Sequence, residues 1–498
     1  MDCRRKAPTN QSITGIERVA DLPRLANLYP VSEGGRKSRS ADFPARSIVR
    51  TPTCTRFAAR LRERSLLRTE KSALRPPSLT GYANLVFSVA VAVLFAAAGQ
   101  ASDWPQFLGP TRNGVYAGAD LADAWPKDGP PVVWQRKVGQ GFSGPVVASG
   151  KLILFHRLDD KETVECLDAR TGKPIWRFDY STGYRDDFGF DEGPRATPAI
   201  ANGRVYTYGA EGALHCLDLA SGKSLWTVDA KTEFHAPKGF FGIACSPLVE
   251  GNAVLLNVGG RDGSGIVAFD KTNGKVLWKA TDDEASYSSP VAATINSRRY
   301  VLFFTRAGLV AAVPANGRIL FQFPFRPPIR NSVSAATPLV LGDLIFLSAS
   351  YDLGAVLLKI SETGPEKIWS SDEVLSNHYA TSVYRDGFLY GIHGRTDPGF
   401  EPPAGLRCVE LKTGKVRWKQ DAFGAATITL AGDQLLILTE KGELLRAEAS
   451  PESFKPNARA QILPTQVRAY PALADGMFYA RSKDKLVCLD LGRPKRDP

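Results

Sequence analysis

Short apolar runs alternate with polar turns throughout residues 131–490. Runs of roughly four to eight residues that are rich in β-branched and aromatic side chains are typical of strands rather than helices. In residues 144–155, for example, Pro-Val-Val-Ala is followed by the turn Ser-Gly-Lys and then by Leu-Ile-Leu-Phe. The pattern predicts a series of hairpins, and therefore an all-β fold.

A second pattern recurs along the same region. Residues 166–176, 216–226, 268–278 and 408–418 share an acidic residue, a Gly-Lys turn and a closing Trp, and 313–321 and 360–369 are weaker copies. The acid can bond nearby backbone N–H groups, and Gly accepts the positive φ of a tight turn. We therefore assign structural roles to Asp168, Gly172, Trp176, Asp218, Gly222, Trp226, Asp270, Gly274, Trp278, Trp369, Gly414 and Trp418.

Eight copies of the preceding hairpin can be identified, and they begin at Gly144, Thr197, Ser246, Ser289, Thr337, Thr381, Thr427 and Tyr470. Repeats of this length are typical of propellers and solenoids. The last copy ends at Asp490 without its Gly and Trp, whereas residues 132–134 form a strand without a repeat. Pairing the two would close a ring. We predict an eight-bladed β-propeller of four-stranded antiparallel blades, closed by an N-terminal strand on the last blade.

The repeated Asp-x-x-Thr-Gly-Lys-x-x-Trp segments resemble those of quinoprotein-type (PQQ-like) β-propellers. This superfamily includes pyrroloquinoline-quinone (PQQ) dehydrogenases and the propeller of the outer-membrane protein assembly machinery. The resemblance covers residues 131–490, and residues 104–114 also resemble the start of secreted propellers of planctomycete-type bacteria. A shared fold leaves the activity open.

The N-terminal region differs from the repeats. An apolar stretch at residues 83–98, followed by small residues up to Ala101, is typical of a signal peptide. A retained signal anchor is the alternative, although about 20 residues are needed to span a membrane. The predicted divisions are an Arg/Ser-rich disordered leader or mis-assigned start (1–81), a signal peptide (82–101), an N-terminal segment (102–130), the propeller (131–490) and a tail (491–498). We expect a periplasmic or secreted protein, with membrane association only if the apolar stretch is retained.

The net charge of +12 is concentrated in the leader, where residues 1–80 hold 17 Lys and Arg against 7 Asp and Glu. The remaining residues hold 46 against 44, so the predicted propeller lacks the basic surface that nucleic-acid binding needs. Five of the seven cysteines follow the leader, and no Cys-x-x-Cys occurs. The odd number argues against a disulfide framework, and the spacing argues against zinc and c-type haem sites.

Segments that interrupt the repeats are the candidates for function. The longest, residues 184–195, has four acids and two arginines that can bind a cation, a sugar or the charges of a partner. The alternative is a solvated loop with internal ion pairs. Residues 377–379 offer a donor, a titratable ring and a phenol. We expect a ligand site on the funnel face from Tyr184, Arg185, Asp186, Asp187, Asp191, Glu192, Arg195, His235, Phe241, Tyr287, Asn331, Asn377, His378 and Tyr379.

The leading hypothesis is a noncatalytic scaffold that binds a protein or glycan through this loop-bearing face. PQQ dehydrogenases characteristically carry an adjacent cysteine pair and often a Cys-x-x-Cys-His haem motif, and this sequence has neither. One alternative is a PQQ-dependent alcohol dehydrogenase-like enzyme that uses PQQ, calcium and an acid from residues 186–192. Another is an outer-membrane assembly scaffold, which the lack of a lipid-anchor Cys disfavours. No catalytic residue, metal ligand or cofactor is assigned.

Overall fold

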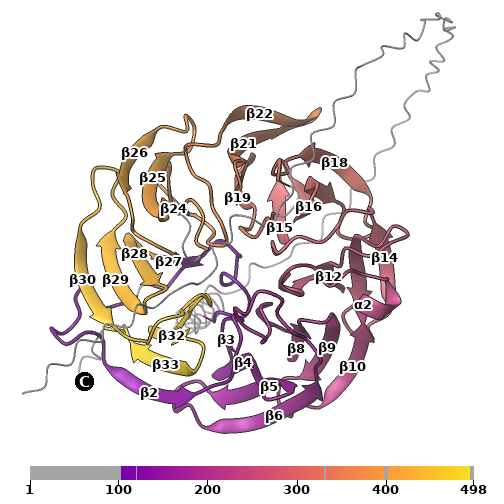
Figure 1. The fold of residues 1–498 in the computed structure, drawn as a ribbon, viewed down its shortest axis with the longest axis horizontal. Helices are drawn as coiled ribbons and strands as arrows, with labels where there is room; N and C mark the ends of the chain where they lie inside the picture. The colour runs from indigo at the N-terminus through magenta and orange to yellow at the C-terminus, as the bar shows by residue number, and fades with distance from the viewer. Residues whose placement is uncertain (1–102, 119, 330–331, 398–401, 494–498) are drawn as a thin grey trace, which may run out of the picture. The chain divides into compact units, whose positions relative to one another are not determined.

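The computed structural model describes residues 103–493 except 119, 330–331 and 398–401. These residues form eight antiparallel sheets arranged as blades around a central axis (Figure 1). The leader and signal peptide predicted at 1–101 lie outside the described residues. The prediction of an all-β, eight-bladed propeller is confirmed, and helix is confined to α2 (Ala230–Glu233) in the described part of the chain. No helix within that part has the length and apolar character needed to cross a membrane.

The first four blades follow each other along the chain, each from an inner to an outer strand. Blade 1 is β3 (Val146–Ala148), β4 (Lys151–Leu158), β5 (Lys161–Asp168) and β6 (Pro174–Ser181); blade 2 is β7 (Ala199–Ala201), β8 (Arg204–Tyr208), β9 (Ala213–Asp218) and β10 (Ser224–Asp229). Blade 3 is β11 (Leu248–Glu250), β12 (Ala253–Asn257), β13 (Ile266–Asp270) and β14 (Val276–Ala280); blade 4 is β15 (Val291–Ile295), β16 (Arg298–Phe304), β17 (Gly308–Ala312) and β18 (Ile319–Pro324).

The next three blades continue in the same order. Blade 5 is β19 (Leu339–Leu341), β20 (Leu344–Ala349), β21 (Gly354–Ser361) and β22 (Gly364–Ser371); blade 6 is β23 (Val383–Arg385), β24 (Phe388–His393), β25 (Gly405–Glu410) and β26 (Val416–Gln420). Blade 7 is β27 (Ala426–Ala431), β28 (Gln434–Thr439), β29 (Glu443–Glu448) and β30 (Pro456–Gln461). Along the middle strands most residues are buried, because both sheet faces pack on neighbouring blades, whereas outer strands such as β6 alternate toward solvent.

Blade 8 combines strands from opposite ends of the propeller. It consists of β31 (Ala472–Ala474), β32 (Met477–Arg481), β33 (Lys485–Asp490) and the N-terminal β2 (Val132–Lys137) as its outer strand. Trp134 pairs with Cys488 in antiparallel register. The predicted closure of the ring is therefore confirmed.

The repeated Trp and Gly hold neighbouring blades together. The Trp176 indole N–H donates to the Leu219 carbonyl of the next blade at 3.0 Å. A Cβ on Gly222 would lie 2.5 Å from the Trp176 ring, so the glycine leaves room for the indole. The same indole bond to the following blade is made by Trp134, Trp226, Trp278, Trp369 and Trp418. Trp134 thus supplies the tryptophan that the last repeat lacks.

A second set of bonds links the blades near the axis, where the Ser-Pro and Thr-Pro motifs lie. A backbone N–H at the entry to one blade donates to a hydroxyl at the entry to another. The donor and acceptor pairs are Gly144 and Thr197, Thr197 and Ser246, Ser246 and Ser289, Thr337 and Thr381, and Thr381 and Tyr470. We call the five acceptor residues the hydroxyl belt. The last pair passes over blade 7, which lacks the motif.

The N-terminal segment before β2 runs through the middle of the ring, as the indigo trace near β27 shows (Figure 1). Trp104 pairs with Val147 of blade 1, and β1 (Val115–Tyr116) adds a parallel strand to β27 of blade 7. Between them the buried Arg112 guanidinium donates to the carbonyls of Ser246, Pro247 and Pro290 in blades 3 and 4. The segment therefore ties together blades that are not neighbours in the ring.

Candidate functional site

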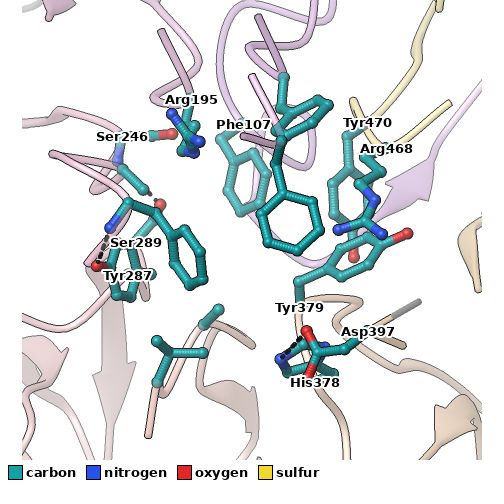
Figure 2. A pocket seen from close by; sticks show the side chains of 16 residues that line it. Phe107, Arg195, Ser246, Tyr287, Ser289, His378, Tyr379, Asp397, Arg468 and Tyr470 are labelled. Atoms are coloured by element: carbon teal, nitrogen blue, oxygen red, sulfur yellow. Dashed lines mark hydrogen bonds and ion pairs between the residues drawn. The ribbon is translucent and has the colours of Figure 1, made fainter. Parts of the chain in front are cut away.

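A pocket of about 160 Å³ opens near the axis, where loops leading into seven of the eight blades converge (Figure 2). These loops lead from an outer strand into the next inner strand, as expected for the funnel face, whereas Asp397 lies between β24 and β25 and Phe107 belongs to the N-terminal segment. Seven aromatic side chains form most of the wall: Phe107, Phe142, Phe190, Phe241, Tyr287, Tyr379 and Tyr470. The other lining residues are Arg195, Ala244, Ser246, Ser289, Val333, Ala335, His378, Asp397 and Arg468. The result is a mainly apolar cavity with a few polar groups, which is the usual character of a small-molecule site.

One wall of the pocket comes from the long insert at 184–195. The buried Asp186 carboxylate accepts backbone N–H groups of Phe190 and Asp191, which folds the insert back on itself. It also lies 3.5 Å from Arg195 Nη2, which donates to the Asp191 carbonyl at 2.9 Å. These bonds hold the Arg195 guanidinium over the rings of Phe142, Tyr184 and Phe241.

A second guanidinium, that of Arg468, lies on another wall. Arg468 Nε donates to Glu440 Oε1 at 2.6 Å, and its side chain remains only 16% exposed. Its guanidinium packs against the rings of Phe142, Phe190 and Tyr379, at 5.5 to 5.9 Å from their centroids. Both arginines therefore contact Phe142, and cation–π contacts of this kind stabilise a desolvated guanidinium.

The end of the pocket opposite Arg195 in Figure 2 contains His378 and Asp397. His378 Nδ1 accepts from the Thr396 backbone N–H at 3.3 Å, so Nε2 carries the proton in the neutral ring and can donate to the Tyr351 hydroxyl at 3.0 Å. Burial lowers the pKa of His378 to about 4, although the Asp397 carboxylate lies 4.0 Å away. The imidazole is therefore neutral at pH 7.

Asp397 is held by a neighbouring arginine. Arg395 Nε donates to Asp397 Oδ2 at 2.8 Å, and the Arg395 guanidinium lies 4.6 Å from the centre of the Tyr351 ring. The carboxylate is 23% exposed, so it remains accessible from the pocket. It is the one acid in the pocket lining among the residues that the structure describes.

The predicted site residues divide into two groups. The structure brings Arg195, Phe241, Tyr287, His378 and Tyr379 together in the pocket. The residues that do not line it are Tyr184, Arg185, Asp186, Asp187, Asp191, Glu192, His235 and Asn377, and Asn331 lies outside the described residues.

Some of the residues outside the lining support those inside it. Tyr184 lies beneath the Arg195 guanidinium, and burial raises its pKa. Asn377 is buried and bonds the Ile392 carbonyl and the Ser382 hydroxyl, which holds the chain just before His378. His235 is exposed at the surface. These placements come from the folded loops and could not be read from residue type.

The four acids of the insert do not converge. Asp187 pairs with Lys238 at 2.7 Å, Asp186 pairs with Arg195, and Glu192 lies 3.6 Å from both Arg157 and Arg185. The buried Asp191 accepts from the Gly193 N–H. Over the described ranges, no three His, Cys, Asp or Glu side chains are grouped so that they could hold a metal ion. The arrangement matches the alternative of a loop with ion pairs and does not fit a calcium site.

Sequence reasoning missed several residues of the pocket, chiefly Phe107, Phe142, Asp397, Arg468 and Tyr470. A signal was present for two of them, because Phe142 and Arg468 each stand two residues before the start of a predicted copy, at Gly144 and Tyr470. Phe107 comes from the N-terminal segment, and its ring packs edge-on against Tyr470 at 5.1 Å. Only the path of that segment through the ring brings it to the site.

Comparisons with solved structures agree with the propeller architecture. BamB from Moraxella catarrhalis has a TM-score of 0.53 at 15% identity, over 74% of this chain and 99% of that one. The quinohemoprotein alcohol dehydrogenase of Comamonas testosteroni has a TM-score of 0.56 at 17% identity, over 82% and 83%. The quinohemoprotein alcohol dehydrogenase ADHIIG of Pseudomonas putida HK5 has a TM-score of 0.57 at 12% identity, over 80% and 81%. Identities this low show a common fold alone.

Sequence comparison defines the family. No curated protein matches the chain. The family model described as outer membrane protein assembly factor BamB matches residues 160–420, which is more than half of the sequence. Those residues span blades 2 to 6 completely and the two outer strands of blade 1. This chain therefore belongs to the PQQ-like β-propeller family that the BamB model describes.

Proposed function

We propose that this chain is an exported, noncatalytic scaffold that binds a glycan or a protein through its loop-bearing face. The pocket near the axis receives one ring-shaped group of that ligand. The observation that carries the proposal is the convergence of seven aromatic side chains and two arginines in a single cavity.

The size of the pocket supports a ring-shaped group. Its volume of about 160 Å³ is close to the roughly 150 Å³ of an engineered protein cavity that binds benzene. The cavity thus has room for one six-membered ring, while the rest of a larger ligand would extend over the surrounding loops. Aromatic walls favour a group with flat apolar faces, and the polar groups at the ends would fix its orientation.

The dehydrogenase alternative draws less support from the geometry. It requires an acid from residues 186–192 to act as base near a calcium-bound quinone. Asp186 instead holds the loop together, and Asp187 and Glu192 face lysine and arginine partners. The likeness to quinohemoprotein dehydrogenases concerns the fold, so it adds no support for the reaction.

Export rests on the apolar stretch at residues 83–98, which lies outside the described residues. We expect the exported protein to begin at or near Ser102, because small residues precede that position. N-terminal sequencing of material recovered from the periplasm or medium tests this expectation. Recovery of a mature chain that still contains residue 50 would contradict it.

A second candidate function, a scaffold in outer-membrane protein assembly, is supported by the family model alone. Family membership shows the fold of this chain. The assembly role belongs to the member that names the family, so for this chain it needs a direct test. Co-purification of the tagged chain from envelope extracts with an integral outer-membrane protein would support this candidate over glycan binding. Recovery of the chain without such a protein would weigh against it.

The binding proposal is tested on arrays of glycans and peptides with the full chain and two variants. Phe190 lines the pocket, whereas Phe188 belongs to the same insert, is 54% exposed and does not line it. We expect Phe190→Ala to weaken binding of the best array ligand by about tenfold or more, because one aromatic wall is lost. Phe188→Ala is the matched control and should change binding by less than about threefold.

Two outcomes would count against the proposal. Equal weakening by both phenylalanine variants would show that the insert, and not the pocket, makes the contact. Absence of any ligand from either array at micromolar protein would contradict a binding role for this face.

A further inference from the structure

Two guanidiniums face the pocket with unused donors. Arg195 binds backbone carbonyls and Asp186 through Nη1 and Nη2, and its Nε has no hydrogen-bond partner among residues of known position. Arg468 uses Nε for Glu440 and Nη2 for the Thr396 carbonyl, which leaves Nη1 without a partner in the described ranges. The acids behind the wall therefore fix both arginines and leave at least one guanidinium nitrogen on each for a ligand.

The positions of these donors indicate where a negative charge would bind. Arg195 and Arg468 both lie within 6 Å of the Phe142 ring, so a ring stacked in the cavity meets a cation on two sides. The arginine side chains are 9% and 16% exposed, and a charge-assisted bond is strong in such partly dry surroundings. A carboxylate accepts from guanidiniums in the required geometry.

The other end of the pocket requires donors on the ligand. The Asp397 carboxylate only accepts hydrogen bonds, and it lies beside the neutral His378. A second carboxylate placed there would be repelled. A hydroxyl group would instead donate to Asp397, so the ligand should be acidic at one end and hydroxylated at the other (Figure 2).

We propose that the ring-shaped group is a sugar acid, a pyranose that carries a carboxylate, as at the end of an acidic polysaccharide. Its carboxylate binds Arg195, its ring lies against the aromatic wall, and its hydroxyls donate to Asp397 and accept from Arg468 at the other end of the pocket. This inference rests on the proposed binding function and adds the chemical class of the ligand. A neutral sugar would leave the Arg195 donor without a charged partner, and an aromatic acid would bring no hydroxyl to Asp397.

Isothermal titration of the full chain with D-glucuronate, D-glucose and benzoate tests the proposal. We expect glucuronate to bind about tenfold or more tightly than glucose, because one charge-assisted bond contributes that much. Benzoate should bind more weakly than glucuronate, since it lacks hydroxyls. Raising the salt concentration should weaken glucuronate binding more than glucose binding.

Two variants assign the effect to the pocket. Arg195→Gln should reduce the preference for glucuronate over glucose to less than about threefold. Arg185→Gln removes the same charge from an arginine that is 63% exposed and outside the lining, so it should keep the preference. Circular dichroism of both variants checks that they fold.

The outcomes separate this inference from the proposed function. Glucuronate and glucose could bind equally well, and Phe190→Ala could abolish the binding of both. That result would overturn the sugar-acid inference and leave the pocket as a ring-binding site. Tighter binding of benzoate than glucuronate would also overturn it, in favour of aromatic acids. If none of the three probes binds, and Phe190→Ala leaves the binding of array ligands unchanged, both the sugar-acid inference and the proposed function would be contradicted.

Discussion

The Gly-Lys-x-x-Trp motif gains its meaning from the contact between blades. Gly222 and Trp226 belong to the same hairpin, yet each contacts a different neighbouring blade. Gly222 makes room for Trp176 of the preceding blade, and Trp226 donates to the Lys271 carbonyl of the following blade. The two residues recur together because every blade must both receive an indole and supply one.

Replacement of this glycine should therefore cost more than backbone strain. Gly222 and Gly203 both have φ near 70°, but a Cβ on Gly203 would meet no atom within 4 Å. We expect Gly203→Ala to cost about 1 kcal/mol from positive φ alone, and Gly222→Ala to cost a further 1–3 kcal/mol from crowding against Trp176. Urea unfolding of the two variants measures the difference. Equal losses would show that the indole adjusts freely.

Buried histidines make the stability depend on pH. Burial lowers the pKa of His156 to about 3 and those of His215 and His393 to about 4, below the unfolded value of 6.5. Above pH 7 these neutral histidines make their full contribution to the free energy of unfolding. That contribution falls as pH drops from about 6.5 toward 4, because the unfolded chain binds protons before the folded chain does. His156 and His215 should each cost about 2 kcal/mol at pH 5, and the partly exposed His393 should cost less.

The measurement is the urea midpoint from pH 7.5 to pH 5. His215→Gln should flatten the decline, whereas His235→Gln, at an exposed position, should leave it unchanged. A midpoint that stays constant down to pH 5 in the unchanged protein would contradict the assignment of neutral buried imidazoles.

Among the strands and loops, the hydroxyl belt links residues at which several of the copies begin. At Thr197, Ser246 and Ser289 a proline follows the belt residue and directly precedes an inner strand, and the hydroxyl accepts a backbone N–H from the entry to the preceding blade. Thr381 Oγ1 accepts from Thr337 N at 3.0 Å, whereas the buried Thr337 Oγ1 has no partner among the described residues.

This difference gives a matched pair of substitutions. Thr381→Val should destabilise the protein by about 1–3 kcal/mol, because it leaves the buried Thr337 N–H without an acceptor. Thr337→Val should be neutral or stabilising, since it removes a hydroxyl that is buried without a bond. Thermal unfolding of the two variants provides the comparison, and a larger loss for Thr337→Val would refute the role of the belt.

The periodic elements could be predicted from the sequence, and the loops could not. Strands, blade number and closure follow from the repeats around residues such as Trp176, because each repeat obeys the same packing requirement. The funnel loops have no shared period, so only their meeting point was predictable. Arg195 and His378 were found by their chemistry, and Arg468 could have been found by its place two residues before a copy, whereas Asp397 needed the folded loops.

Across the whole molecule, the N-terminal segment acts as a brace through the ring. Arg112 is buried and donates to carbonyls in blades 3 and 4, while its flanking residues pair with blades 1 and 7. Burial lowers its pKa to about 10, so it remains charged at neutral pH. The three carbonyls it contacts therefore compensate a charge that water cannot reach.

Removal of this charge tests the brace. Arg112→Met should destabilise the protein by about 2–4 kcal/mol, because several buried carbonyls lose their donor at once. Arg185→Met, at an exposed arginine, should change stability by less than about 0.5 kcal/mol. Differential scanning calorimetry of both variants checks the ranking. A change below 1 kcal/mol for Arg112→Met would indicate that water replaces the guanidinium.

The pairing of β2 with β33 also means that the ring can close only at the end of synthesis. The first outer strand emerges before any of the blades, and its partner emerges after all of them. During synthesis, β2 and the growing array therefore present open edges to other chains and to proteases. Such long-range pairing is slow to form. The final strand thus converts an open, vulnerable intermediate into a closed ring, and chaperone protection would matter most just before that step.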